Sequence, residues 1–263
     1  MGYNWIDPKE FSINCILLMD RWLVRCICER DDEDFRKNLG IALAANPVVA
    51  WYCKEKAPEI SSVVDALIVS APTVSTAGEV RAAECFVLAD IDWAVVYLYP
   101  EIMNKNCEYI YNWDKKRLYE LADFDDKIVL DVGAGTGRLT FTVAPKAKRV
   151  YASEPVDRLR EFMRDEIKRH DIKNVTVLDG ICEWLPYEDS TFDIVMSGHV
   201  LADDWDKEIA EQIRVCKPDG WLLDCSGDND EPKTELVKRG WEEIRYTDSS
   251  STLMYNYRKH VKK

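Results

Sequence analysis

The sequence lacks the cysteine and histidine patterns of a metal-binding or disulfide-bonded protein. Its nine cysteines are scattered singly apart from Cys26 and Cys28, no CxxC pair occurs, and there are only three histidines. This usage argues against a zinc site, and the odd number of cysteines favours reduced thiols. We therefore expect no metal and a reducing compartment.

Long apolar runs are also missing. Charged residues interrupt every apolar stretch within about 13 residues, which is shorter than a membrane span. The opening residues, MGYNWIDPKEF, contain no basic region followed by an apolar core, so they do not resemble a signal peptide. We expect a cytoplasmic protein that has no membrane partner.

The chain has no excess of positive charge. Its formal net charge is −13, and the two halves divided near residue 120 carry roughly −6 and −7, so neither half is a hidden basic module. Proteins that bind phosphate backbones usually present a basic face. The charge therefore argues against a nucleic-acid partner, while the 47% hydrophobic content is enough to bury one large core or two smaller ones.

Residues 1–118 have the pattern of a helical region. Asp7, Pro8 and Glu10 provide a helix start, and apolar residues recur as far as Ile27, so one amphipathic helix is expected over this stretch. Further helices are expected over 34–45, 59–70 and 77–98, the last after a capping box that begins at Thr76. This region could form a cap over a sheet, recognise a substrate or form a homodimer interface.

Residues 119–263 have a different pattern, in which short β-branched runs alternate with amphipathic stretches. This alternation is typical of βαβ units around a parallel sheet. The last two runs are joined by DSSS, which is too short for a helical crossover, so they should pair as an antiparallel hairpin. The expected fold is an α/β domain with seven strands, mostly parallel, after an all-helical N-terminal region. The predicted strands are 127–132, 148–153, 174–178, 192–197, 220–225, 241–247 and 251–258.

The first of these strands runs into three glycines at every second position, Gly133, Gly135 and Gly137. A strand that ends in Gly-x-Gly and opens into a helix leaves backbone N–H groups facing a space without Cβ atoms. A ligand's polar end therefore approaches the backbone there. Both a dinucleotide and S-adenosylmethionine also require an acid near the end of the second strand to accept hydrogen bonds from ribose hydroxyls, and Glu154 occupies that place.

The spacing of the glycines separates these two ligands. The dinucleotide fingerprint G-x-G-x-x-G needs a third glycine where this sequence has Arg138. Asp131, two residues before the first glycine, would repel a pyrophosphate but suits a ligand that carries an ammonium and a sulfonium. The pattern favours S-adenosylmethionine.

At this point the chain resembles the class I S-adenosylmethionine-dependent methyltransferases, and within them the type 11 group. VLDVGAGTGRLT looks like their first motif, VYASEPV like their second-strand acid motif, and DGICEWLPYEDSTFDIVMSGHVL like their adenine-side loop and fourth strand. The resemblance covers residues 127 to about 226 and implies a Rossmann-like sheet, a methyltransferase domain over 119–263 and S-adenosylmethionine as cofactor.

The resemblance also implies roles for individual residues. The glycine turn would wrap the methionine end of the cofactor, Asp131 would orient the turn and help to hold the amino group, and Glu154 would bridge the ribose hydroxyls. Ser197 would lie beside the methyl group. The implied cofactor-binding residues are Asp131, Gly133, Ala134, Gly135, Gly137, Glu154, Pro155, Asp179, Ile181, Cys182, Ser197 and Tyr111.

On the adenine side, this sequence departs from the acidic version of the family's loop. Ile181 cannot accept a hydrogen bond from the adenine amino group, so we expect apolar packing there, with the Cys182 backbone N–H donating to the ring. Asp179 is the alternative acceptor. The Cys182 thiol has no neighbouring base in the sequence and is interpreted as a packing residue.

Two aromatic positions keep two interpretations each. His199 follows the fourth strand, where it could accept a proton during catalysis, and a packed or partly exposed ring explains it equally well. Tyr111 could touch the cofactor's carboxylate, or its helix could pack aromatic residues on the sheet.

The sequence thus predicts methyl transfer from S-adenosylmethionine to a small-molecule acceptor. The fourth strand ends in MSGHV and lacks the Asn/Asp-Pro-Pro-aromatic motif of enzymes that methylate amino groups of adenine or glutamine, and no Pro-Cys nucleophile is present. Two alternatives stay open: a non-catalytic scaffold that keeps the cofactor fold, and an NAD-dependent oxidoreductase.

Overall fold

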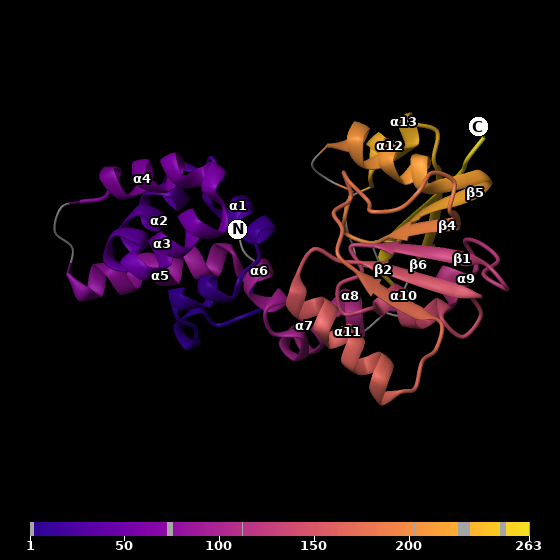
Figure 1. Ribbon diagram of the computed structural model, residues 1–263, viewed down its shortest axis with the longest axis horizontal. Helices are drawn as coiled ribbons and strands as arrows, with labels where there is room; N and C mark the ends of the chain where they lie inside the picture. Colours follow the sequence, from indigo (N-terminus) through magenta and orange to yellow (C-terminus); the bar gives the residue numbers. More distant parts are fainter. Residues whose placement is uncertain are drawn as a thin grey trace. The chain divides into compact units, whose positions relative to one another are not determined.

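The computed structural model describes residues 3–72, 76–111, 113–201, 204–225, 232–247 and 251–262; the side chain of Tyr111 lies outside this description. The chain divides into two compact units, Met1–Met103 and Asn104–Lys263 (Figure 1). The second unit therefore begins before residue 119, where the sequence pattern places the boundary, because residues 104–118 make their contacts with the sheet unit.

The first unit is helical. The single amphipathic helix predicted from Asp7 is wrong, because the stretch is broken at Phe11 and Met19, whose backbones are extended. Ser12 caps a new turn by accepting a hydrogen bond from the Asn14 N–H (3.2 Å), so a local cap overrides the periodicity. The short turns are η1 (Pro8–Glu10), η2 (Ile13–Leu18) and η3 (Pro58–Ile60); the helices are α1 (Arg21–Cys28), α2 (Glu33–Ala45), α3 (Pro47–Lys56), α4 (Ser61–Ser70), α5 (Ala77–Asp90) and α6 (Asp92–Tyr97).

The capping box at Thr76 and Glu79 is present, but the helix that it starts ends at Asp90 instead of residue 98. Helix α7 (Pro100–Asn106) follows α6 and leads into the second unit. The helices α2 and α5 pack together in this unit, and helix α3, which the sequence pattern did not predict, adjoins α2 directly.

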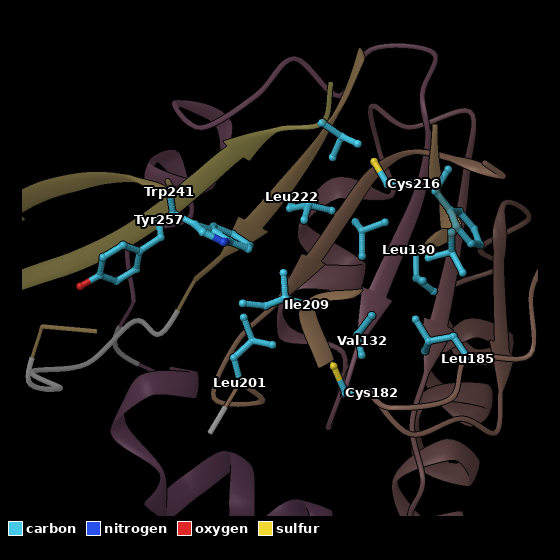
Figure 2. Packing of buried hydrophobic residues seen from close by; sticks show 14 of the residues in the cluster. Leu130, Val132, Cys182, Leu185, Leu201, Ile209, Cys216, Leu222, Trp241 and Tyr257 are labelled. Atoms are coloured by element: carbon cyan, nitrogen blue, oxygen red, sulfur yellow. The ribbon is translucent and has the colours of Figure 1, made fainter. Parts of the chain in front are cut away.

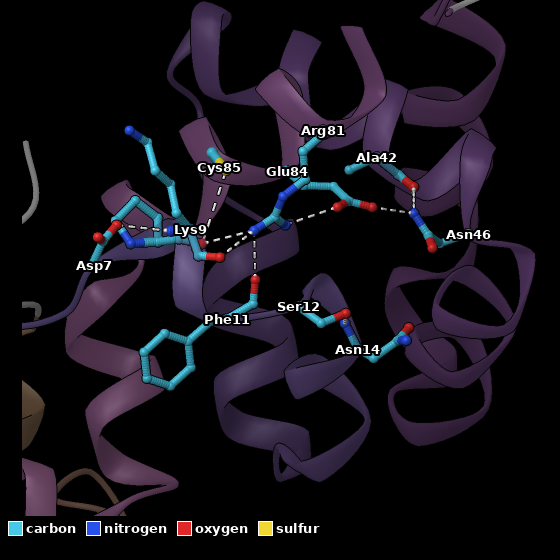
Figure 3. A network of polar contacts seen from close by, with 11 residues as sticks. Asp7, Lys9, Phe11, Ser12, Asn14, Ala42, Asn46, Arg81, Glu84 and Cys85 are labelled. Carbon is cyan, nitrogen blue, oxygen red and sulfur yellow. Dashed lines mark hydrogen bonds and ion pairs between the residues drawn. The ribbon is translucent and has the colours of Figure 1, made fainter. Parts of the chain in front are cut away.

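Arg81 of helix α5 makes most of the hydrogen bonds that hold the start of the chain to this helix, and the Cys85 thiol adds one to Pro8. Arg81 Nη2 donates to the carbonyl oxygens of Pro8 (3.1 Å), Lys9 (3.1 Å) and Phe11 (2.9 Å), as Figure 3 shows. Its Nη1 donates to Glu84 (3.1 Å). The other carboxylate oxygen of Glu84 accepts from the side-chain amide of Asn46 (2.9 Å), just before α3. One guanidinium thus holds three main-chain carbonyls of the turn η1 and the residue that follows it.

The second unit contains a sheet of seven strands in the described residues, with the order β3-β2-β1-β4-β5-β7-β6. The first five strands are parallel, and β7 is antiparallel to both β5 and β6. The predicted Rossmann-like sheet with its antiparallel hairpin is therefore confirmed. The strands are β1 (Ile128–Val132), β2 (Arg149–Ser153), β3 (Val175–Leu178), β4 (Phe192–Ser197), β5 (Cys216–Asp224), β6 (Glu242–Thr247) and β7 (Leu253–His260).

Strand β5 begins at Cys216, earlier than the predicted residue 220. Cys216 pairs with Phe192 before the register shifts, so Pro218 and Asp219 form an irregularity inside the strand. The helices of this unit are α8 (Glu108–Tyr111), α9 (Lys116–Tyr119), α10 (Arg138–Val143), α11 (Asp157–Arg169), α12 (Trp205–Val215) and α13 (Thr234–Lys238).

Both faces of the sheet are buried. Leu130 and Leu222 point to one face, where they meet Ile209 from α12 (Figure 2). Val129 and Leu223, one residue away in each strand, belong to the core on the opposite face, as the alternation of side chains along a strand requires. With both faces filled, the carboxyl ends of the parallel strands are the edge at which α/β folds bind ligands.

Candidate active site

The glycine turn after β1 has a backbone that only glycine adopts easily. Gly133, Gly135 and Gly137 have φ values of 64°, 58° and 89°. A Cβ atom on Gly133 would lie 2.4 Å from Val200 Cγ2, so the turn is also crowded on the side of the loop that follows β4. The Ala134 N–H donates to the carbonyl of Ser153 (3.0 Å), which fixes the turn to the end of β2.

Asp131 anchors the far side of this turn. It is buried in β1, and its Oδ2 accepts hydrogen bonds from the backbone N–H of Thr140 (2.9 Å) and from the Thr140 hydroxyl (2.6 Å). Burial raises the pKa of Asp131 from 3.8 to about 7, against the opposing effect of these hydrogen bonds and of the nearby Arg138 charge. Asp131 therefore joins β1 to the first turn of α10, on either side of the glycines.

Glu154 joins the turn to the second strand. Its Oε2 accepts from the Gly135 N–H (2.8 Å), and its Oε1 accepts from the Val156 N–H (2.9 Å). Burial raises the pKa of Glu154 from 4.5 to about 7. A carboxylate oxygen can accept more than one hydrogen bond, so both oxygens retain capacity for the hydroxyl groups of a ligand. Pro155 follows directly and is half-buried at the start of α11.

The loop after β3 lies next to Glu154. Arg160 of α11 donates to the Glu154 carbonyl (2.7 Å) and to Asp179 (3.2 Å), so one side chain links the acid to the loop. Ile181 is half-buried and pairs with Trp184 in a short antiparallel bridge. Sequence reasoning missed Arg160, although its place six residues after Glu154 on an amphipathic helix was a usable signal.

The thiol of Cys182 is part of the core. It is buried in the cluster of Figure 2, donates to the carbonyl of Glu208 (3.9 Å) and accepts from Gln212 Nε2 (3.4 Å). Burial raises the pKa of Cys182 to about 12. The thiol is therefore a packing group and not a nucleophile, as the sequence predicts.

The end of β4 lies beside β1 at the same edge. Ser197 pairs with Val132 and Asp224 and is fully buried, and its hydroxyl has no hydrogen-bond partner among the described residues. His199 follows with a φ of 61°, an unusual value for a residue other than glycine, and its exposed ring packs on Tyr109 with centroids 4.4 Å apart.

The side chain of Tyr111 lies outside the described part of the chain, so the contact predicted for it stays a prediction. Its neighbour Tyr109 is the residue of α8 that reaches the end of β4. The same segment contacts the glycine turn, because the Thr136 hydroxyl donates to Asn104 Oδ1 (2.6 Å). No sequence pattern marks Thr136 and Asn104 as partners, since both are short polar side chains of common types.

These residues fit S-adenosylmethionine. The glycine turn offers backbone without side chains, Glu154 retains hydrogen-bonding capacity for ribose hydroxyls, and the unpartnered Ser197 hydroxyl lies buried at the edge where a polar ligand would end. We propose that Asp131 helps to hold the cofactor's ammonium group and that Glu154 accepts hydrogen bonds from its ribose hydroxyls.

No group of three or more His, Cys, Asp or Glu side chains that could hold a metal ion occurs within the described ranges. None of the helices in the part of the chain described by the structure is long and apolar enough to cross a membrane.

Comparisons with known proteins support the same assignment. Residues 129–220 match the methyltransferase domain family. A demethylmenaquinone methyltransferase from Lactobacillus johnsonii is 30% identical over 138 residues, which cover 49% of this chain and 55% of the relative. The ubiquinone/menaquinone biosynthesis C-methyltransferase UbiE from Idiomarina loihiensis is 36% identical over 104 residues, covering 36% of this chain and 40% of that protein.

The chain spans about half the length of the curated relatives that it matches first. A crystal structure of a SAM-dependent methyltransferase from Aquifex aeolicus has the same fold, with a TM-score of 0.52 and 18% identity over 62% of this chain and 98% of that one. These matches favour neither the non-catalytic scaffold nor the NAD-dependent oxidoreductase. Residues 129–220 of the unit from Asn104 to Lys263 therefore match a methyltransferase domain family, and the unit has the fold of S-adenosylmethionine-dependent methyltransferases.

Proposed function

We propose that this cytoplasmic protein transfers a methyl group from S-adenosylmethionine to a small-molecule acceptor bound near the carboxyl ends of β4 and β5. The observation that supports the proposal is the hydrogen bond between the Gly135 N–H and Glu154, which sets an acid beside a glycine turn held by Asp131, where the proposed ribose would lie. The relatives named for demethylmenaquinone and ubiquinone support a small acceptor, and the net charge of −13 disfavours nucleic acid.

The reaction asks little chemistry of the protein itself. When bound, S-adenosylmethionine supplies a methyl group that is already activated for displacement. The chain's residues have to hold the acceptor close and aligned and to exclude water. A general base is needed only if the acceptor is a hydroxyl or a protonated amine, and His199 is the residue that we propose for that role, because its exposed ring lies just beyond β4.

For the first unit, we propose a role in selecting the acceptor, since the family match begins only at residue 129. A homodimer through its helices is the alternative role. Size-exclusion chromatography with light scattering separates these, because a monomeric protein with full activity rules out the dimer.

The proposal is tested by calorimetric titration with S-adenosylmethionine and with its demethylated product. Binding of both, with no binding of NAD, is expected, and failure of both to bind would remove the function. The acceptor class is then tested with a radioactive methyl donor and a cell extract that has been separated by ultrafiltration. Label is expected in a small molecule that chromatography separates from the unreacted donor; label found only in retained protein or RNA would contradict a small acceptor.

A further inference from the structure

Arg138 is the first residue of α10 and directly follows the glycine turn. A cation in the first turn of a helix is disfavoured by the helix dipole, so a basic residue there needs compensating contacts. In the dinucleotide fingerprint this position is glycine, which has no side chain. The contacts of the Arg138 guanidinium therefore indicate what the residue does.

The guanidinium contacts two distant parts of the unit. Nη2 donates to the carbonyl of Cys225 just after β5 (2.6 Å), and Nη1 donates to the carbonyl of Tyr109 in α8 (3.3 Å). Its carbon atom Cζ also lies over the rings of Tyr109 (5.5 Å) and Trp113 (4.9 Å). Arginine suits this combination because its planar fork can donate to two carbonyls while it stacks on aromatic rings.

Gly198 at the end of β4 leaves the space for this side chain. A Cβ atom at position 198 would lie 2.4 Å from Arg138 Nη2 and 2.6 Å from the Cys225 carbonyl oxygen. The second contact is with backbone, which cannot move aside as a side chain can. A glycine is therefore required at 198 if the guanidinium is to reach β5.

A second link holds the same segment. Thr136 in the glycine turn donates to Asn104, and Tyr109 packs on the ring of His199 at 4.4 Å. The segment 104–111 is thus attached to the turn at its start through Thr136 and at Tyr109 through Arg138. The attachment at Tyr109 matters for the proposed acceptor side of the site, because it positions the Tyr109 ring that packs on His199.

We infer that Arg138 is a positioning residue that fastens the segment 104–111 to the glycine turn and so places Tyr109 against His199 at the acceptor side of the site. The attachment itself is independent of any ligand, whereas its use in catalysis rests on the proposed function. A lysine at 138 keeps the charge but cannot donate to both carbonyls and stack between two rings. The hydrogen bonds and the ring contacts of the planar guanidinium, and not its charge alone, hold the segment.

The test is backbone hydrogen exchange of the full chain, measured by mass spectrometry with and without S-adenosylmethionine. The variants are Arg138→Lys and Gly198→Ala, which disturb the same contact from its two sides. The matched control is Arg149→Lys, because Arg149 also stacks on a tyrosine, Tyr151 (5.6 Å), and donates one hydrogen bond, to Thr176 (2.8 Å), away from the glycine turn.

Without cofactor, we expect amides of residues 104–111 to exchange about tenfold faster or more in both variants, as loss of charged hydrogen bonds implies. Arg149→Lys should leave this segment unchanged. With S-adenosylmethionine, Arg138→Lys should still show protection of residues 133–137, because the turn and Glu154 are intact, but it should lose the protection of 104–111 that the parent shows.

Equal exchange of 104–111 in the parent and in both variants would overturn the inference, and so would a uniform rise across the whole unit in the variants. Retention of the cofactor-induced protection of 104–111 in Arg138→Lys would also overturn it. Failure of the parent to bind S-adenosylmethionine would instead refute the proposed function, while the measurements without cofactor would still decide the role of Arg138.

Discussion

Replacing Gly137 by alanine tests whether the glycine turn needs bare backbone or only a left-handed one. Gly137 has a φ of 89°, and an added Cβ would lie 2.4 Å from Cε2 of Phe141. Gly240 provides a matched control, because its φ is 79° and nothing lies within 4 Å of its Cβ position. The two substitutions share the backbone strain and differ in the contact.

The magnitudes follow from these two terms. The left-handed backbone costs alanine about 1–2 kcal/mol, and the smaller entropy of the unfolded chain returns about 0.4–1 kcal/mol. Gly240→Ala should therefore lose about 1 kcal/mol of unfolding free energy. Gly137→Ala should lose about 1–3 kcal/mol more of unfolding free energy than Gly240→Ala, because the new methyl group overpacks against the Phe141 ring.

The assay is differential scanning calorimetry of the full chain, following the transition that S-adenosylmethionine raises in the parent, since only the unit that binds it is stabilised. For a domain of this size, 1 kcal/mol shifts Tm by about 2–4 °C. Equal shifts in the two variants would refute the reasoning, since they would show that the Phe141 ring moves aside without cost. Adding Phe141→Leu to Gly137→Ala should recover part of the loss.

Three further outcomes are expected. Glu154→Gln should weaken S-adenosylmethionine binding in calorimetry by about a hundredfold, because charged hydrogen bonds to ribose hydroxyls are lost, whereas Glu166→Gln on the following helix α11 should leave binding unchanged. Burial raises the pKa of Glu154 from 4.5 to about 7, so its contribution to stability is complete below pH 4.5 and is lost as pH rises through 7. Denaturation between about pH 5 and about pH 8 should show a smaller loss in Glu154→Gln than in the parent, because Asp131, whose pKa is also raised to about 7, remains in the variant. Asp224→Asn breaks a buried ion pair with Lys233 (2.9 Å) and should cost about 3–5 kcal/mol in urea unfolding, while Asp206→Asn, from an exposed pair, should cost under about 1 kcal/mol.

The sheet could be predicted from the sequence because each strand is marked locally. The β-branched run before Gly133 and the run ending at Ser153 are bounded by turn residues, so neither depends on distant contacts for its recognition. The N-terminal stretch shows the opposite case. Its apolar periodicity continues across Ser12, yet the short-range cap at that residue starts a new turn, and periodicity alone does not reveal which of the two wins.

The site was predictable to the same extent. The sequence marks Asp131, the glycines and Glu154 because they are close to strand ends, and the structure brings them together through direct hydrogen bonds. Their contacts with the cofactor stay predictions. Arg138 was visible only as a departure from the dinucleotide fingerprint, because its partners, Tyr109 and the carbonyl after β5, are 29 and 87 positions away along the chain.

The attachment of the N-terminal segment to Arg81 has a consequence for which residues of that segment can be substituted. The three acceptors on residues 8, 9 and 11 are main-chain carbonyls, which every amino acid provides, so substitutions in that segment leave the attachment in place. The only side chain that these three hydrogen bonds require is that of Arg81. Substitutions at residues 8, 9 and 11 should therefore leave these three hydrogen bonds in place, whereas a substitution of Arg81 would remove all three.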